Sequence, residues 1–80
     1  MRIDKYLKVS RLVKRRTVAN ELCDAGNVSA NGRPVRASYS VGVGDIITLT
    51  MGVRTIRVRV EEVEESAAKN KAREMYTVIE

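Results

Sequence analysis

The spacing of apolar residues changes once along this 80-residue chain, from a helical period to an alternating one. Over residues 3–13, apolar or small residues recur at steps of three and four: Ile3, Tyr6, Leu7, Ser10 and Val13. This spacing predicts an amphipathic helix with that face toward a core, and Lys5, Lys8 and Arg11 step by three along the opposite side. Asp4 falls in the first turn, where a carboxylate suits the positive end of the helix dipole.

A cluster of three cations, Lys14-Arg15-Arg16, separates this helix from a second one. Thr17 is predicted to cap the second helix, which continues at helical spacing until Gly26 ends it. The pattern predicts a helical hairpin with a positively charged turn, and the free first amides of the second helix would point outward and attract phosphate. Val9 and Leu12 lie off the inner face and are interpreted as half-buried flanks, with contact to a partner as the alternative.

After Gly26 the pattern is that of strands and tight turns. A short strand over 28–30 meets Asn31-Gly32, a strong hairpin signal, and Pro34 limits the return strand near 35–37 to a short or edge position. A loop over 38–43 and the Gly44-Asp45 turn lead to further strands, which are expected at 46–51, 55–60 and 76–79. The stretch 66–75 holds helix-forming residues without a wide apolar face. The predicted fold class is α+β, with the two-helix hairpin packed on a small, mostly antiparallel sheet.

Composition restricts both the core and the chemistry. The chain has three Tyr and neither Phe nor Trp, so its core must be aliphatic. With no His and a single Cys, the usual acid–base, nucleophilic and metal-dependent schemes lack their residues, so we expect no enzyme activity, metal or cofactor. Cys23 shares a face with core residues and is interpreted as a buried structural thiol. No apolar run exceeds two residues, which is too short for a signal sequence or a membrane span, and a cytoplasmic protein is expected.

Charge is distributed unevenly along the chain. The net charge is +5, but residues 1–36 hold nine basic and three acidic groups, while residues 61–80 carry a net charge of −3. A basic segment of this kind, with ten Arg against five Lys, indicates a surface for a polyanion. A solvated surface or a module that docks an acidic protein are the alternatives. We expect the acidic tail to lie away from the polyanion, whereas Arg57 and Arg59 either extend the basic surface or face solvent on an exposed strand.

The order of these features resembles the RNA-binding domain first recognised in ribosomal small-subunit protein four. The residues that carry the resemblance are Met1–Leu7, Ser10–Ala19, Gly26–Val28, Val35, Ser38 and Val41–Ile46. We expect one RNA-binding domain over 1–80, with the shared motif at about 1–51 and an extension over 52–80. The resemblance implies that RNA is bound by the two-helix face. The candidate RNA-binding residues are Arg2, Lys5, Lys8, Arg11, Lys14, Arg15, Arg16, Thr17 and Arg36.

Within the family, the chain is similar to small stand-alone bacterial members that act in ribosome-associated quality control. That similarity implies binding to large-subunit rRNA and peptidyl-tRNA on obstructed large ribosomal subunits, in support of alanine tailing of stalled chains. It also implies a quality-control elongation factor as a partner on the same subunit. A heat-shock-type factor that recycles large subunits is the alternative within the family, although such factors carry a long basic extension whereas this chain ends with acidic residues.

Overall fold

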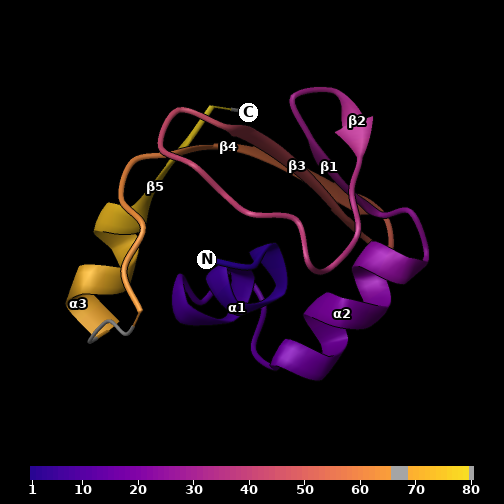
Figure 1. The fold of residues 1–80 in the computed structure, drawn as a ribbon, viewed down its shortest axis with the longest axis horizontal. Helices are drawn as coiled ribbons and strands as arrows, with labels where there is room; N and C mark the ends of the chain where they lie inside the picture. The colour runs from indigo at the N-terminus through magenta and orange to yellow at the C-terminus, as the bar shows by residue number, and fades with distance from the viewer. Residues whose placement is uncertain (66–68, 80) are drawn as a thin grey trace.

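Two helices cover one face of a five-stranded antiparallel sheet in the computed structural model, which describes residues 1–65 and 69–79 (Figure 1). The elements in chain order are α1 Ile3–Val9, α2 Arg16–Asp24, β1 Val28–Ala30, β2 Arg33–Pro34, β3 Ile46–Met51, β4 Arg54–Val60, α3 Lys69–Ala72, the 3-10 helix η1 Arg73–Met75 and β5 Tyr76–Val78. The predicted α+β class and the packing of the helical hairpin on the sheet are confirmed. Among the described residues, no helix is long and apolar enough to cross a membrane.

The sheet has the strand order β2-β1-β3-β4-β5, and every pairing is antiparallel. Asn31 and Gly32 both have positive φ, at 53° and 86°, as expected for the tight turn between β1 and β2. Across the central strands, Ile47 lies opposite Ala30 on one side and Val58 on the other, and all three are buried. Strand alternation therefore gives the sheet one apolar face, and the helices cover that face.

The core is aliphatic, as the composition predicts, with one tyrosine at its centre. Ile3, Tyr6 and Leu7 of α1 are fully buried. The Tyr6 hydroxyl donates a hydrogen bond of 2.7 Å to the carbonyl oxygen of Met75, whose side chain is also fully buried. Burial raises the pKa of the Tyr6 hydroxyl, and the neighbouring Tyr76 and Glu61 raise it further. The C-terminal helical turn thus closes one side of the core, although its sequence offers only a narrow apolar face.

Both helix boundaries at the basic turn differ from the sequence-based prediction. The first helix ends at Val9 instead of residue 13 because Arg11 adopts a left-handed conformation with φ of 65°. Beyond it, the Val13 amide donates to the Leu7 carbonyl, which keeps Val13 buried as predicted. Thr17 is not the cap of the second helix. Helix α2 begins at Arg16, its N-cap is Arg15, and no side chain caps it.

Two strand predictions are confirmed with their bounds, and the other three strands have different bounds. The strands over 28–30 and 46–51 lie where they are expected, while β4 begins one residue earlier and β5 ends at Val78. The return strand is Arg33–Pro34, before the predicted range 35–37, and it is the short edge strand that proline requires. In the predicted helix-forming stretch 66–75, residues 66–68 lie outside the described residues and the remainder forms α3 and η1.

Candidate nucleic-acid interface

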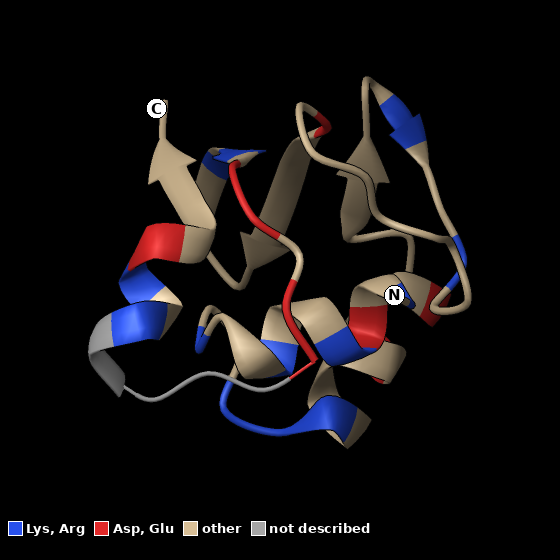
Figure 2. Cartoon of the chain, turned by 60° about the vertical axis from the view of Figure 1, so that its left-hand side comes forward, with Lys and Arg blue, Asp and Glu red and all other residues tan. Residues whose placement is uncertain are grey.

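The nine candidate residues come from four neighbouring segments on the helical side of the molecule. Arg2 precedes α1, Lys5 and Lys8 lie on α1, and Arg36 follows β2. The α1–α2 loop and the first turn of α2 supply the rest, namely Arg11, Lys14, Arg15, Arg16 and Thr17. Figure 2 shows a continuous basic stretch within this loop, at the base of the molecule. Eight of the nine are exposed, and Lys5 is half-buried.

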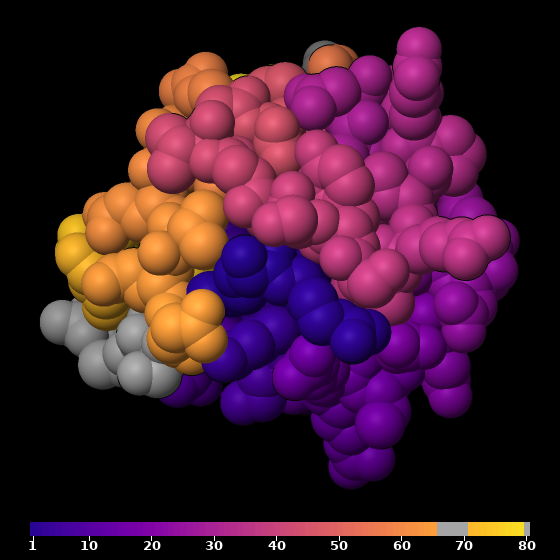
Figure 3. Space-filling model, viewed as in Figure 1, coloured from indigo at the N-terminus to yellow at the C-terminus, as the bar shows by residue number. Residues whose placement is uncertain are grey.

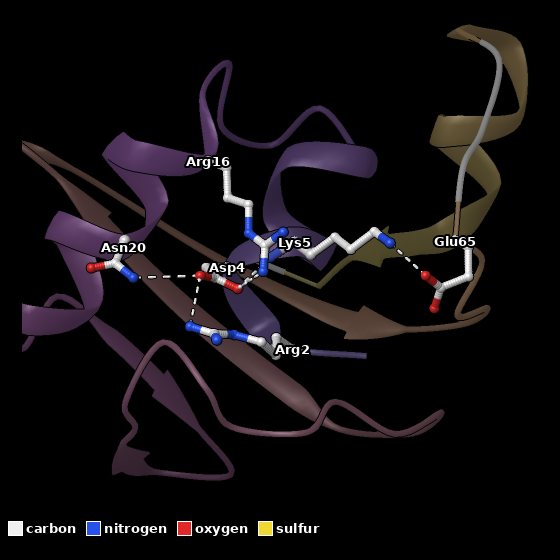
Figure 4. Close-up of polar contacts among 6 residues, drawn as sticks. All are labelled: Arg2, Asp4, Lys5, Arg16, Asn20 and Glu65. Carbon is white, nitrogen blue, oxygen red and sulfur yellow. Dashed lines mark hydrogen bonds and ion pairs between the residues drawn. The ribbon is translucent and has the colours of Figure 1, made fainter.

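A buried carboxylate joins two of these arginines. Asp4 is only 2% exposed, and its carboxylate oxygens lie 3.2 Å from Nη2 of Arg2 and 3.3 Å from Nη2 of Arg16. Asn20 Nδ2 donates to the same carboxylate at 3.4 Å, and the backbone N–H of Lys5 donates at 2.8 Å (Figure 4). Asp4 therefore holds the guanidinium groups of two residues from different elements on either side of one carboxylate. We name Arg2, Asp4, Arg16 and Asn20 the Asp4 cluster.

Asp4 is held in its charged form. Burial by itself raises the pKa of the Asp4 carboxyl, but hydrogen bonds from Arg16, Asn20 and the Lys5 amide, together with the Arg16 charge, lower it. The net result is a pKa below the ordinary value. At neutral pH the cluster thus contains one negative and two positive charges, which leaves an excess of positive charge toward solvent.

The sequence pattern indicates for Asp4 only a favourable place at the helix dipole, and it does not indicate these contacts. One signal was present in the sequence. On a helical wheel Asp4 borders the inner face defined by Ile3 and Leu7, and a carboxylate at such a border requires a partner. The identity of the partners depends on how α1 and α2 cross, which the sequence pattern does not specify.

Backbone pairing fixes the position of Arg2. The residue forms an isolated antiparallel bridge with Ser40, and the flanking Ile3 amide donates to the Tyr39 carbonyl at 2.8 Å. The loop that provides this pairing is itself held by Asp45. Its carboxylate accepts hydrogen bonds from the Tyr39 hydroxyl and the Gly42 amide, both at 2.9 Å. The first residues are consequently enclosed between the loop around residue 40 and the segment after β4, as Figure 3 shows.

Two surface hollows adjoin the Asp4 cluster. One, of about 500 Å³, is lined by the whole cluster together with Thr17 and Glu21. The other, of about 450 Å³, shares Arg2 and Asn20 with the first and adds Arg36 and Ser38 among its lining residues. Arg2 therefore contributes to both hollows. The structure brings Arg36 into the same region as the α1–α2 cations, although 20 residues separate it from Arg16.

The remaining cations divide into paired and unpaired groups. Among the described residues, five candidate cations have side chains without a hydrogen bond or ion pair: Lys8, Arg11, Lys14, Arg15 and Arg36. Lys5 differs because its ammonium group forms an ion pair with Glu65. The unpaired cations are free to meet an external anion without first breaking an internal contact.

The acidic segment does not lie away from the basic surface, contrary to the sequence-based expectation. Residues 61–65 run from the end of β4 toward α1 (Figure 2), where Glu65 meets Lys5. Other glutamates of the tail form their own ion pairs, with Glu62 at 3.1 Å and Glu74 at 3.5 Å from Lys71. The acidic segment stays near the basic surface because its carboxylates reach cations within the tail and one further cation, Lys5, on α1.

Arg57 and Arg59 do not extend the helical basic surface. They alternate along β4 with the buried Val58 and Val60, so they lie on the sheet face opposite the helices. Arg59 is exposed and pairs with Glu61 at 3.0 Å. Of the two interpretations left open by the sequence, the structure supports ordinary outward-facing strand residues.

Cys23 is a buried structural thiol, as predicted. Its side chain belongs to the core cluster, and burial, with smaller effects from Asp4 and Asp24, raises the pKa of its thiol to about 11. Within the part of the chain that the structure describes, no group of three or more acidic, Cys or His side chains is placed to hold a metal ion.

Comparison with known proteins adds to this geometry. The S4 domain model matches residues 1–47. The RQC P-site tRNA stabilizing factor of Bacillus subtilis is 46% identical over 99% of this chain and 92% of its own length, and that of Listeria monocytogenes is 46% identical over 99% and 86%. Among solved structures, Vibrio cholerae heat shock protein 15 superposes with a TM-score of 0.91 at 29% identity, over 98% of this chain and 80% of the other. The hypothetical protein HP1423 gives a TM-score of 0.83 at 30% identity, over 98% and 95%.

Proposed function

We propose that this chain, which belongs to the S4 domain family and to the family of RQC P-site tRNA stabilizing factors, binds structured RNA of the large ribosomal subunit through its α1–α2 face. The observation that carries the proposal is the Asp4 cluster. A buried carboxylate places two half-exposed guanidinium groups at one hollow, and the adjoining α1–α2 loop adds the unpaired cations Arg11, Lys14 and Arg15.

The chemistry of this face suits phosphate. Asp4 accepts from one terminal nitrogen of each arginine, and the Arg2 and Arg16 side chains stay 51% and 47% exposed, so their other N–H groups can donate to phosphate oxygens. The uncapped N-terminus of α2 adds amide donors beside Arg16. The scarcity of aromatic residues disfavours base stacking, so recognition should follow the shape of folded RNA more than the sequence of a single strand.

The name shared by the relatives supports a more specific role on the ribosome. We propose that the chain contacts both large-subunit rRNA and the peptidyl-tRNA on an obstructed large subunit, and so keeps that tRNA in place while a quality-control elongation factor adds alanines to the stalled chain. This role places the protein in the cytoplasm and gives it a binding function without catalysis of its own. The candidate RNA-binding residues are the nine named from the sequence, among which Arg2 and Arg16 are the two that form ion pairs with Asp4.

Co-sedimentation with purified large ribosomal subunits tests the proposed face. Arg2→Ala and Arg16→Ala should each weaken binding by about tenfold or more, since a hydrogen bond to a charged group contributes about 1.5–3 kcal/mol. Arg33→Ala is the matched control because it removes the same charge from the edge strand β2, which lies at the opposite end of the view in Figure 1 from the α1–α2 loop. Circular dichroism checks that each variant is folded. Wild-type binding by both Arg2→Ala and Arg16→Ala would show that RNA is not bound here.

The similarity to heat shock protein 15 favours a second candidate, a factor that recycles large subunits. Recovery of large subunits that carry peptidyl-tRNA with alanine-tailed chains supports quality control, whereas recovery of subunits without tailed chains supports recycling. A module that binds only an acidic protein is separated from both by a salt titration. RNA binding should lose affinity with a log–log slope of about −0.7 to −0.9 for each neutralised phosphate.

A further inference from the structure

A third hollow, of about 480 Å³, lies between the α1–α2 loop and the end of β3. Leu12, Val13, Val18 and Met51 provide its apolar lining, and Lys14 and Arg15 complete it. On the α2 wheel, Val18 points roughly opposite to Arg16 and Asn20. The hollow is therefore on the other side of the first turn of α2 from the Asp4 cluster.

Val13 belongs to the core, but the other three apolar residues of this hollow keep part of their surface exposed. Val18 is 39% exposed, and Leu12 and Met51 are only half-buried at the edge of the core cluster. A single exposed aliphatic residue is ordinary on a protein surface, but here three partly exposed ones gather around one depression. A ligand that contacts all of them would remove their remaining apolar surface from water.

The charge at this hollow is of one sign. No carboxylate lines it, whereas the hollow at the Asp4 cluster includes both Asp4 and Glu21. Among the described residues, the side chains of Lys14 and Arg15 have no ion-pair or hydrogen-bond partner. An aliphatic floor beside two unpaired cations is complementary to an apolar side chain flanked by carboxylates.

The lining chemistry favours a protein ligand over a nucleobase. Stacking of bases needs aromatic or guanidinium planes, and reading of their edges needs polar groups, yet the floor of this hollow consists of aliphatic and thioether side chains. Arg15 is the only lining residue with such a plane, and the four apolar lining residues suit an aliphatic anchor such as leucine. We infer that this hollow docks an acidic segment of a protein partner, with an aliphatic side chain on Val18 and Met51 and carboxylates on Lys14 and Arg15. The inference does not rest on the proposed RNA-binding role.

A peptide titration followed by NMR tests the inference. The ¹⁵N-labelled chain is titrated with two short peptides that share the same leucines, one with flanking Asp and Glu and the other with flanking Lys. The acidic peptide should shift the amides of Leu12, Val18 and Met51 in a saturable manner, and the basic peptide should leave them unchanged. Equal effects of the two peptides, or no saturable shift with the acidic one, would overturn the inference.

Two glutamate substitutions provide the matched comparison. Val18→Glu should weaken the acidic peptide by about tenfold or more, because it removes an apolar contact and places a carboxylate in the hollow. A glutamate in the first turn of a helix suits its dipole, so this variant should fold. Val53→Glu, at a fully exposed valine in the β3–β4 turn, should bind like the wild type. Equal weakening by both substitutions contradicts docking at this site, and so does a hairpin RNA that shifts these amides when the acidic peptide does not.

Discussion

Replacing Asp4 by asparagine separates positioned arginines from simple positive charge as the basis of RNA affinity. The substitution keeps the size of the side chain but removes the anion that joins Arg2 and Arg16. It also raises the net charge of the chain from +5 to +6. If total charge governed affinity, the variant would bind RNA more tightly than the wild type. If the arginines must be held in place, it should bind more weakly.

The structure sets the size of the expected loss. Arg2 and Arg16 are each tied to Asp4 by one ion-pair contact, at 3.2 and 3.3 Å, while about half of each side chain stays exposed. An arginine side chain has about 2 kcal/mol of rotamer entropy to lose, and release from Asp4 should return about half of that to each. Binding must then order both again, which costs about 2 kcal/mol in total and weakens affinity about thirtyfold. The added positive charge offsets part of this, so we expect a loss of about tenfold.

Glu21→Gln is the matched control. Glu21 lines the same hollow, is exposed, and its side chain has no hydrogen bond or ion pair among the described residues. The variant gains the same charge without loss of an anchor, and it should bind a hairpin RNA as tightly as the wild type or slightly more so. Fluorescence anisotropy at fixed salt measures both variants, with thermal unfolding as the check on folding. Equal affinity of Asp4→Asn and Glu21→Gln would show that RNA affinity does not depend on arginines held in place by Asp4.

Three further predictions concern the core and its titratable groups. Tyr6→Phe removes the 2.7 Å hydrogen bond to the Met75 carbonyl, which still accepts hydrogen bonds from two backbone amides. The free energy of unfolding should therefore fall by about 1 kcal/mol, and Tm should fall by about 4–8 °C in a calorimetric scan. Cys23, with a thiol pKa of about 11, should react with iodoacetamide at pH 8 about two hundredfold more slowly than a free thiol of pKa about 8.5, and denaturant should abolish the difference. Asp4 and Asp45 both have lowered pKa values in the fold, so the stability that they contribute is complete above the unfolded pKa of about 3.9 and is lost as pH falls through the folded pKa values. Asp45→Asn should therefore make Tm fall less steeply with decreasing pH in the acid range. The same dependence of Tm on pH in the variant and the wild type would contradict this.

The sequence predicts the fold well where the determinants are local. Asn31-Gly32 specifies its tight turn through two positive φ angles, and the alternation over 55–60 matches the inward face of β4. The end of α1 was not predictable in the same way. The helical period continues through Ser10 to Val13, and the chain leaves the helix at Arg11 in a conformation that usually selects glycine. The arginine at position 11 is not a residue type that predicts a turn.

For the candidate site, the sequence identifies the cations but not their arrangement. The concentration of positive charge in residues 1–36 follows from composition alone. The Asp4 cluster requires the crossing of α1 and α2, and the ion pair between Lys5 and Glu65 joins residues 60 positions apart. Such contacts depend on tertiary packing, which neither spacing nor propensity encodes. Only the structure therefore shows which of the cations are paired and which remain unpaired.

Mapping of RNA contacts by NMR shows directly whether the α1–α2 face binds RNA. A short hairpin RNA is titrated into the ¹⁵N-labelled chain, and shifts are followed for backbone amides and for arginine side-chain N–H groups. We expect saturable shifts concentrated at residues 2–5, 14–20 and 36–38. The side chains of Arg2 and Arg16 should shift among the most, and Arg57 and Arg59 on the outer face of the sheet should not shift. Shifts concentrated on that outer face, or no saturable shift at Arg2 and Arg16, would contradict this expectation.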